Sequence, residues 1–210
     1  MNQKMAIIVY EYTLMISRIA MLNILWLIFV LLGAGIFGFL PATVTIYSVY
    51  RKQNDHSGEF NWFFFAWKQF WFYLKKLFLV SFGFTFICLS LFLSYVTLGS
   101  QSILFNRIIV VIFIYVFFLV VPYFSVNEAH FDLKLMKQIK NSVLLPFFWG
   151  VTSIKVLLVF FATSILFYLV PGLIPFFAFS LPVYLTANML VERWNKQLDT
   201  LGITGGENDD

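Results

Sequence analysis

The sequence predicts an all-α membrane protein, a polytopic bundle of three helical hairpins. Hydrophobic residues make up 61% of the 210 residues and charged residues only 11%, whereas soluble domains average about 45–50% and about 25%. Four blocks contain no Asp, Glu, Lys or Arg: 19–50, 77–106, 108–127 and 156–191. A helix crosses the hydrocarbon core with about 20 apolar residues, so every block is long enough. This pattern excludes soluble, fibrous and disordered proteins.

The first block predicts one full helix and a shorter returning helix. Four residues in its middle favour a break: Gly33, Gly35, Gly38 and Pro41. Glycine tolerates turn geometry and proline removes a helix hydrogen bond. Two full spans would need about 40 residues, and this block has 32. We therefore expect the returning helix to continue towards Arg51 and Lys52.

The later blocks predict two more hairpins. Residues 77–98 and 107–124 form one pair, connected by the polar stretch between them. The last block has 36 residues, which would make a helix of roughly 54 Å against a core of about 30 Å. Pro171, Gly172 and Pro175 lie where it must break, so we expect helices near 150–170 and 174–192. The total is five or six transmembrane helices, depending on whether residues 41–50 cross.

Two amphipathic helices are expected at the membrane interface. The first, residues 60–76, has ten aromatic residues among seventeen, with Asn61, Lys68 and Lys75 at seven-residue spacing. Aromatic rings and lysines suit the interface, where the ammonium groups reach water or lipid phosphates. Docking of a cytoplasmic partner on this helix is the functional interpretation. Its position between two spans argues against nucleic-acid binding.

The second interfacial helix is predicted at 128–141, with Asn127 as its N-cap. One face carries His130, Lys134, Lys137 and Asn141. Glu128 and Asp132 favour the start of a helix dipole, and we expect this helix to be a solvated basic face. Alternate positions on a helix do not converge on a metal ion, so neither a metal site nor any other cofactor is expected.

Charge placement predicts orientation. Nearly all Lys and Arg fall on one side of the predicted spans, whereas Arg107 falls on the other, and basic residues mark the cytoplasmic side. We expect a multi-pass protein of the cell membrane with its C-terminus in the cytoplasm. The N-terminus is cytoplasmic in a six-helix arrangement and external in a five-helix one. Residues 1–198 form one transmembrane domain, and 199–210 form a flexible acidic tail.

Few polar residues in the spans are candidates for function. Asn23, Lys155 and Asn188 could line a polar pathway, although snorkelling to the interface is the favoured explanation of Lys155 and interhelical hydrogen bonds explain the asparagines equally well. The candidates for interfacial docking are Lys68, Lys75, Lys134 and Lys137. No catalytic constellation and no acidic proton relay is found in the spans, so the chain is not expected to be an enzyme.

Residues 22–52 also carry a family resemblance. Asn23, Trp26, the glycine-rich stretch, Pro41-Ala42-Thr43, Tyr47 and Arg51-Lys52, followed by WFFFAWKQF, resemble the YesL family of small bacterial membrane proteins of unknown function. The resemblance implies a multi-span protein of Gram-positive-type bacteria, often encoded beside carbohydrate-uptake transporters and polysaccharide-degrading enzymes. It supplies no catalytic residues.

Together these observations predict an accessory or regulatory component linked to carbohydrate uptake. Its partners would be the lipid bilayer and transporter subunits or another membrane protein. A stand-alone small-solute transporter or channel is the alternative. The oligomeric state is not predicted.

Overall fold

The computed structural model describes residues 3–55, 61–98, 103–130 and 134–200. The helices are α1 (Gln3–Leu32), α2 (Ile36–Asp55), α3 (Trp62–Lys76), α4 (Phe78–Leu98), α5 (Ile103–Tyr115), α6 (Val121–His130), α7 (Leu135–Phe148), α8 (Gly150–Leu169), α9 (Ile174–Phe177) and α10 (Ser180–Thr200). A π-helical turn, Val116–Val120, joins α5 to α6, and a 3₁₀ turn, Pro171–Leu173, leads into α9. These described segments contain no strand, which confirms the all-α class. The tail predicted at 199–210 lies almost entirely outside the described residues.

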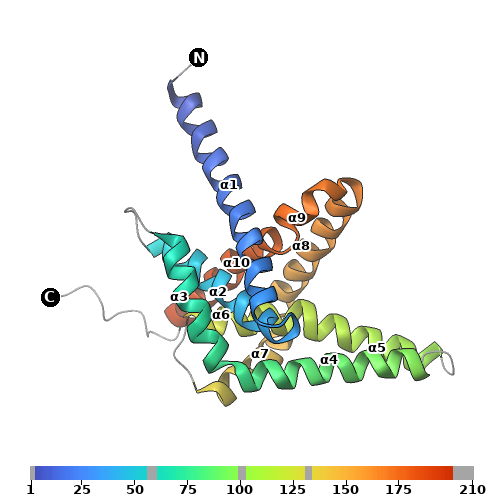
Figure 1. The fold of residues 1–210 in the computed structure, drawn as a ribbon. Coiled ribbons are helices and arrows are strands. Elements are labelled where there is room, and N and C mark those ends of the chain that lie inside the picture. Colours follow the sequence, from blue (N-terminus) through green and yellow to red (C-terminus); the bar gives the residue numbers. More distant parts are fainter. Residues whose placement is uncertain (1–2, 56–60, 99–102, 131–133, 201–210) are drawn as a thin grey trace.

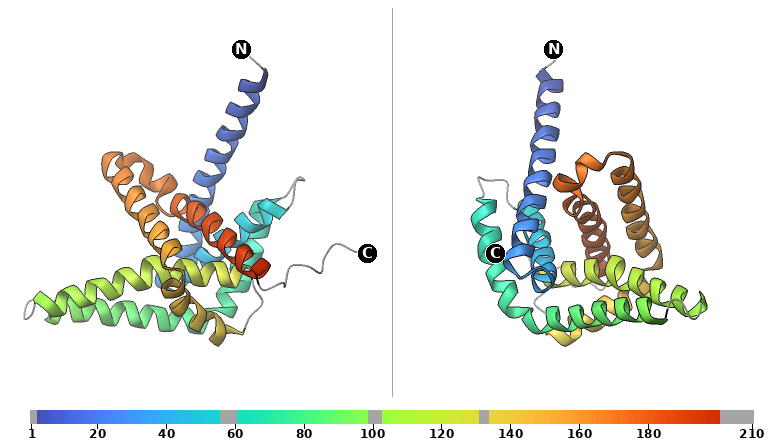
Figure 2. Two further views of the ribbon diagram at one scale, coloured as in Figure 1. Left: turned by 180° about the vertical axis from the view of Figure 1, so that it is seen from behind. Right: turned by 45° about the vertical axis from the view of Figure 1, so that its right-hand side comes forward.

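The three predicted hairpins are present, and they extend from a shared centre in different directions (Figures 1 and 2). They consist of α1 with α2, of α4 with α5, and of α8 with α9 and α10. The π turn ends at Val120, two residues before Pro122 in the first turn of α6. Proline has no N–H to donate to the preceding turn, and a π turn accommodates such an interruption without ending the helix.

The α1–α2 turn depends on its glycines. Gly35 has φ +72° and Ala34 has φ 58°, the left-handed region that glycine adopts freely. A Cβ on Gly33 would lie 2.2 Å from the Cα of Gly38. A Cβ on Gly38 would lie 2.7 Å from the carbonyl oxygen of Val30. The predicted break is confirmed. The backbone segments on its two sides come into close contact at Gly33 and Gly38.

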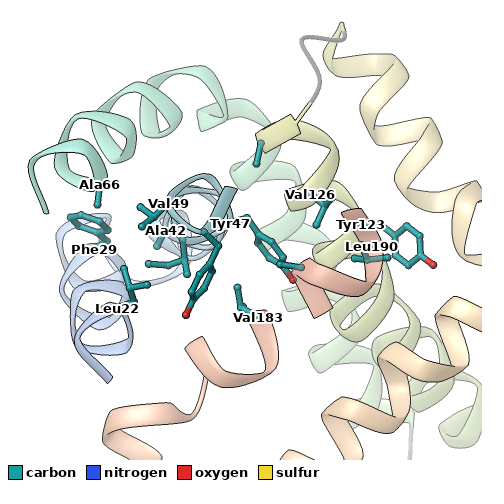
Figure 3. Close-up of a cluster of buried hydrophobic side chains, with 14 of the residues drawn as sticks. Leu22, Phe29, Ala42, Tyr47, Val49, Ala66, Tyr123, Val126, Val183 and Leu190 are labelled. Carbon is teal, nitrogen blue, oxygen red and sulfur yellow. The ribbon is translucent and has the colours of Figure 1, made fainter. Parts of the chain in front are cut away.

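Helix α2 lies at the centre of the protein, where every residue from 41 to 50 is buried. Figure 3 shows Tyr47 among side chains from α1, α6 and α10. Its phenol lies 2.9 Å from the Thr186 hydroxyl. Thr45 and Ser48 donate to the carbonyls of Pro41 and Val44, and these local bonds satisfy hydroxyls that would otherwise be costly to bury.

Among the described residues, four helices are long and apolar enough to cross a membrane: Ile8–Leu32, Phe78–Thr97, Asn106–His130 and Gly150–Leu169. Residues 171–177 and 180–197 form a pair bent by 59° that counts as a fifth span. Only 6% of the apolar window in α4 is buried by the protein, so lipid or another chain must cover it. The described residues thus support a polytopic membrane protein with up to five spans. Helix α2 is not one of the spans found among the described residues.

Of the two predicted interfacial helices, the first is present and the second has different bounds. Helix α3 matches the first, and Asn61 is its N-cap, because its side chain accepts a hydrogen bond from the Phe64 amide. The bounds of the second, 128–141, were wrong. Glu128 lies in the last turn of the preceding helix, α6, and α7 begins at Leu135 after Lys134 in the N-cap position. The reason is tertiary: Asn127 and Glu128 find buried partners, so the apolar helix continues through them.

Candidate functional site

A buried ion pair marks the charged end of the protein, where α2, α3 and α6 meet. The Glu128 side chain is 0% exposed, and the Nζ atom of Lys76 lies 2.7 Å from its Oε1 atom. Lys76 is the last residue of α3 and Glu128 lies in the last turn of α6. A carboxylate away from water is tolerated only with a partner. The pair therefore fixes the end of α3 against α6.

Two further contacts join α2 to the same place. The Nη1 atom of Arg51 donates to the carbonyl oxygen of Ala129 at 2.6 Å. The Ser48 hydroxyl lies 3.0 Å from the Tyr73 phenol. Burial raises the pKa of Tyr73, so its phenol stays neutral and can donate or accept in this pair. Helix α2 is thus bonded to both α6 and α3.

These residues border a polar cavity of about 300 Å³. It is lined by Ser48, Arg51, Lys52, Phe65, Gln69, Tyr73 and Ala129. The Lys52 ammonium lies 4.5 Å from the centre of the Phe65 ring, a cation–π distance. A cavity with a guanidinium, an ammonium and an amide suits a polar or acidic group rather than an apolar one.

Asn127 bonds α6 to α7 and α10. Trp194 Nε1 donates to its Oδ1 atom at 2.9 Å, and its Nδ2 atom donates to the Ser142 hydroxyl at 3.3 Å. Ser142 in turn donates to the carbonyl of Gln138 at 2.7 Å. Asn127 is therefore a buried connector between three helices, which corrects its prediction as an N-cap.

The polar groups at this end of the protein join its helices to one another. Within the segments that the structure describes, no group of three or more His, Cys, Asp and Glu side chains could hold a metal ion. The polar groups at this end are a paired carboxylate, cations, hydroxyls and amides. They hold helices together and offer hydrogen-bond donors at an accessible rim.

The residues predicted for a polar pathway are not brought together. Asn23 is buried, where its Oδ1 atom accepts from the amides of Phe179 and Ser180 at 2.9 and 3.0 Å. Its Nδ2 atom donates to the Pro175 carbonyl at 2.8 Å. All three of these backbone atoms lie in or beside the break between α9 and α10, so Asn23 supplies bonds that the interrupted backbone lacks.

Lys155 and Asn188 lie elsewhere and are exposed. Lys155 borders a second cavity, of about 410 Å³, whose lining includes neither Asn23 nor Asn188. The pathway through these three residues stays a prediction. The docking candidates Lys68, Lys75, Lys134 and Lys137 are all exposed, two in α3 and two at the start of α7.

The ion pair between Lys76 and Glu128 was not predicted from the sequence, because Glu128 was expected to be solvated. One signal was present: Glu128 directly follows the charge-free block 108–127, so a helix continuing by one turn places it at the end of a span. Its partner could not be read from the sequence, because Lys76 is one of two adjacent lysines and its neighbour Lys75 is exposed.

The fold and this site define a multi-span helical membrane protein with a charged, hydrogen-bonded end. A family profile described as "Protein of unknown function, DUF624" matches residues 19–97. The uncharacterised protein YteU of Bacillus subtilis (strain 168) is 30% identical over 175 residues, covering 80% of this chain and 77% of YteU. The uncharacterised protein YesL of the same organism is 31% identical over 141 residues, 63% of each chain. The chain belongs to this family of unknown function, which confirms the predicted resemblance. No solved structure matches it.

Proposed function

We propose that the protein is a non-catalytic accessory or regulatory component of a carbohydrate-uptake system in the cell membrane, and that it contacts its partner through the exposed face of α3. The observation that carries the proposal is the asymmetry of this helix. Ala66, Phe70 and Tyr73 are buried against the core. Five large rings remain exposed on the other side: Phe63, Phe64, Trp67, Trp71 and Phe72.

The exposed face of α3 has the composition of a contact surface. Trp67 and Trp71 stand edge to face with ring centres 6.2 Å apart, and tryptophan is enriched among residues that dominate binding energy. The Lys76–Glu128 pair and the Ser48–Tyr73 bond hold the helix in place. A surface that is already ordered loses less conformational entropy on binding. Lys68 and Lys75 add charge that can select an acidic partner.

The cytoplasmic side is the proposed location of this face. The support is the bias of Lys and Arg towards the loops and ends that include α3 and the start of α7. The C-terminus is then cytoplasmic, and the N-terminus is also cytoplasmic if α2 completes a crossing. The carbohydrate link rests on the resemblance to the YesL family alone.

The alternative, a stand-alone small-solute transporter, has weaker support. Each of the three hydrogen bonds that Asn23 makes serves the α9–α10 break, and the other two pathway candidates are exposed to the exterior of the protein. A polar path would need groups that converge inside the bundle.

The test is site-specific photocrosslinking in the bacterium that encodes the protein. A benzophenone side chain replaces Trp71 on α3 or, as the control, Phe161, which is 66% exposed on α8. Cells grow on a polysaccharide digest or on glucose. We expect the α3 probe to join a transporter subunit during growth on the digest, and the α8 probe to join only lipid. Lipid adducts alone at both positions would reject partner docking and leave α3 as a membrane anchor.

A further inference from the structure

The second cavity lies where α7 meets α8 beside α10, and its lining is cationic. It measures about 410 Å³. Lys155 contributes from α8 and Arg193 and Lys196 contribute from α10, and Lys196 pairs at 2.7 Å with the single carboxylate, Glu192. Arg193 lies over the buried ring of Trp149, 5.8 Å from its centre. The cavity therefore has an excess of positive charge above an aromatic base.

The start of α8 adds hydrogen-bond donors to this lining. Helix α7 ends at Phe148, Trp149 is the joint, and α8 begins at Gly150 with no side-chain cap. The first amides of a helix have no partner within the helix, and they favour an anion at that end. A Cβ on Gly150 would meet nothing within 4 Å, so the backbone is open to a ligand there.

An apolar stripe leads away from the cavity along α8. It consists of side chains at spacings of three and four residues, which share one helix face: Val151 (73% exposed), Ile154 (59%), Leu158 (58%), Phe161 (66%) and Ile165 (45%). Helix α8 is one of the four helices that qualify as spans. The stripe therefore faces the hydrocarbon region, and the cationic cavity lies at the end of the same helix.

We propose that this cavity binds the headgroup of an anionic phospholipid, with the acyl chains lying along the stripe of α8. The phosphate would meet Lys155, Arg193 and Lys196 together with the open amides at Gly150. Charge complementarity selects an anionic headgroup over a zwitterionic one. The continuous stripe favours a lipid over free phosphate, because burial of its methylene groups adds affinity that a soluble anion lacks. In this arrangement Lys155 contacts lipid at the end of its span instead of lining a solute path.

The test is native mass spectrometry of the delipidated full-length protein titrated with defined lipids. The probes are dioleoyl phosphatidylglycerol, dioleoyl phosphatidylcholine, dihexanoyl phosphatidylglycerol and inorganic phosphate. The variants are Lys155→Met, Arg193→Gln and Lys196→Gln. Arg107→Gln is the control, since it removes an exposed cation of α5 that does not line the cavity. Circular dichroism and gel filtration check that each variant is folded.

We expect dioleoyl phosphatidylglycerol to bind more tightly than the phosphatidylcholine, and each cavity substitution to weaken it about fivefold. The Arg107→Gln control should leave the affinity unchanged. The short-chain lipid should bind weakly, and millimolar phosphate should not displace the long-chain one. Equal binding of the two dioleoyl lipids, or unchanged affinity in all three folded cavity variants, would overturn the site. Full displacement by inorganic phosphate would overturn the lipid assignment.

Discussion

The Nζ atom of Lys76 lies 2.7 Å from the Oε1 atom of Glu128, whose side chain is entirely buried. The two residues are far apart in the sequence and lie in the last turns of two different helices, α3 and α6. The contact therefore determines where α3 lies relative to the core. It also determines which aromatic side chains of α3 remain exposed for lipid or a partner.

Removing one member of this pair should be costlier than removing both. Lys76→Met removes the ammonium partner of a buried carboxylate, at a cost of about 3–5 kcal/mol for a fully buried pair. We expect the lower end, because the Lys76 side chain is 28% exposed. Adding Glu128→Leu should restore most of the free energy of unfolding. Thermal or SDS unfolding in detergent measures the stability of the single and the double variant. Lys75→Met is the matched control, and equal losses in it and in Lys76→Met would show that the ion pair contributes nothing.

Alanine at either interhelical glycine should destabilise the first hairpin. In Gly33→Ala and Gly38→Ala the new methyl meets backbone atoms at 2.2 and 2.7 Å, which cannot move aside as a flexible side chain can. Overpacking of this kind costs about 1–3 kcal/mol. Gly83→Ala on α4, where a Cβ meets nothing within 4 Å, is the control and should be neutral or stabilising. The measurement is the unfolding midpoint in detergent, and wild-type midpoints in both variants would contradict the close contact.

Asn23 should be essential for stability. Asn23→Ala leaves the Phe179 and Ser180 amides and the Pro175 carbonyl without this partner, and each buried polar group left unpaired costs about 1–3 kcal/mol. Asn23→Asp keeps the acceptor for both amides and should lose less. Asn188→Ala, at an exposed position, should change the free energy of unfolding by less than about 0.5 kcal/mol. A stable Asn23→Ala protein with altered solute flux in liposomes would favour the pathway instead.

The hydrogen bond between Trp194 and Asn127 should hold α10 against α6. Trp194→Phe removes the indole donor at 2.9 Å while it keeps an aromatic ring beside Trp149. The unpaired Asn127 oxygen should lower the free energy of unfolding by about 1–3 kcal/mol. Trp71→Phe, on the exposed face of α3, controls for the loss of an indole. If both substitutions shift the unfolding midpoint equally, the hydrogen bond is not the cause.

Thiol labelling can establish the orientation, because Cys88 is the chain's single cysteine and Cys88→Ser gives a clean background. We expect an impermeant maleimide to label Arg107→Cys in intact cells. Lys68→Cys and Lys196→Cys should react only after permeabilisation, because lysines and arginines accumulate on the cytoplasmic side. Labelling of Lys68→Cys in intact cells would reverse the proposed orientation.

The sequence by itself determined the class, the hairpins and their turns. Charge-free blocks of span length and glycine or proline breaks are local signals, because hydropathy and backbone geometry act over one or two helical turns. The aromatic helix was predicted at 60–76 on the same basis, whereas the role of Asn61 as its N-cap came only from the structure. Local pattern also showed that the charges gather at one end of the protein.

Tertiary structure alone decided what the polar residues do. Glu128, Asn127 and Asn23 were predicted as a solvated residue, a cap and a pathway residue, and each is buried with partners from another helix. A buried polar group takes whichever partner the packing brings within about 3 Å, and sequence spacing does not encode that partner. The central position of α2 has the same origin. The apolar residues of α2 predicted a short returning helix. The helix forms the centre of the core because other helices pack around it.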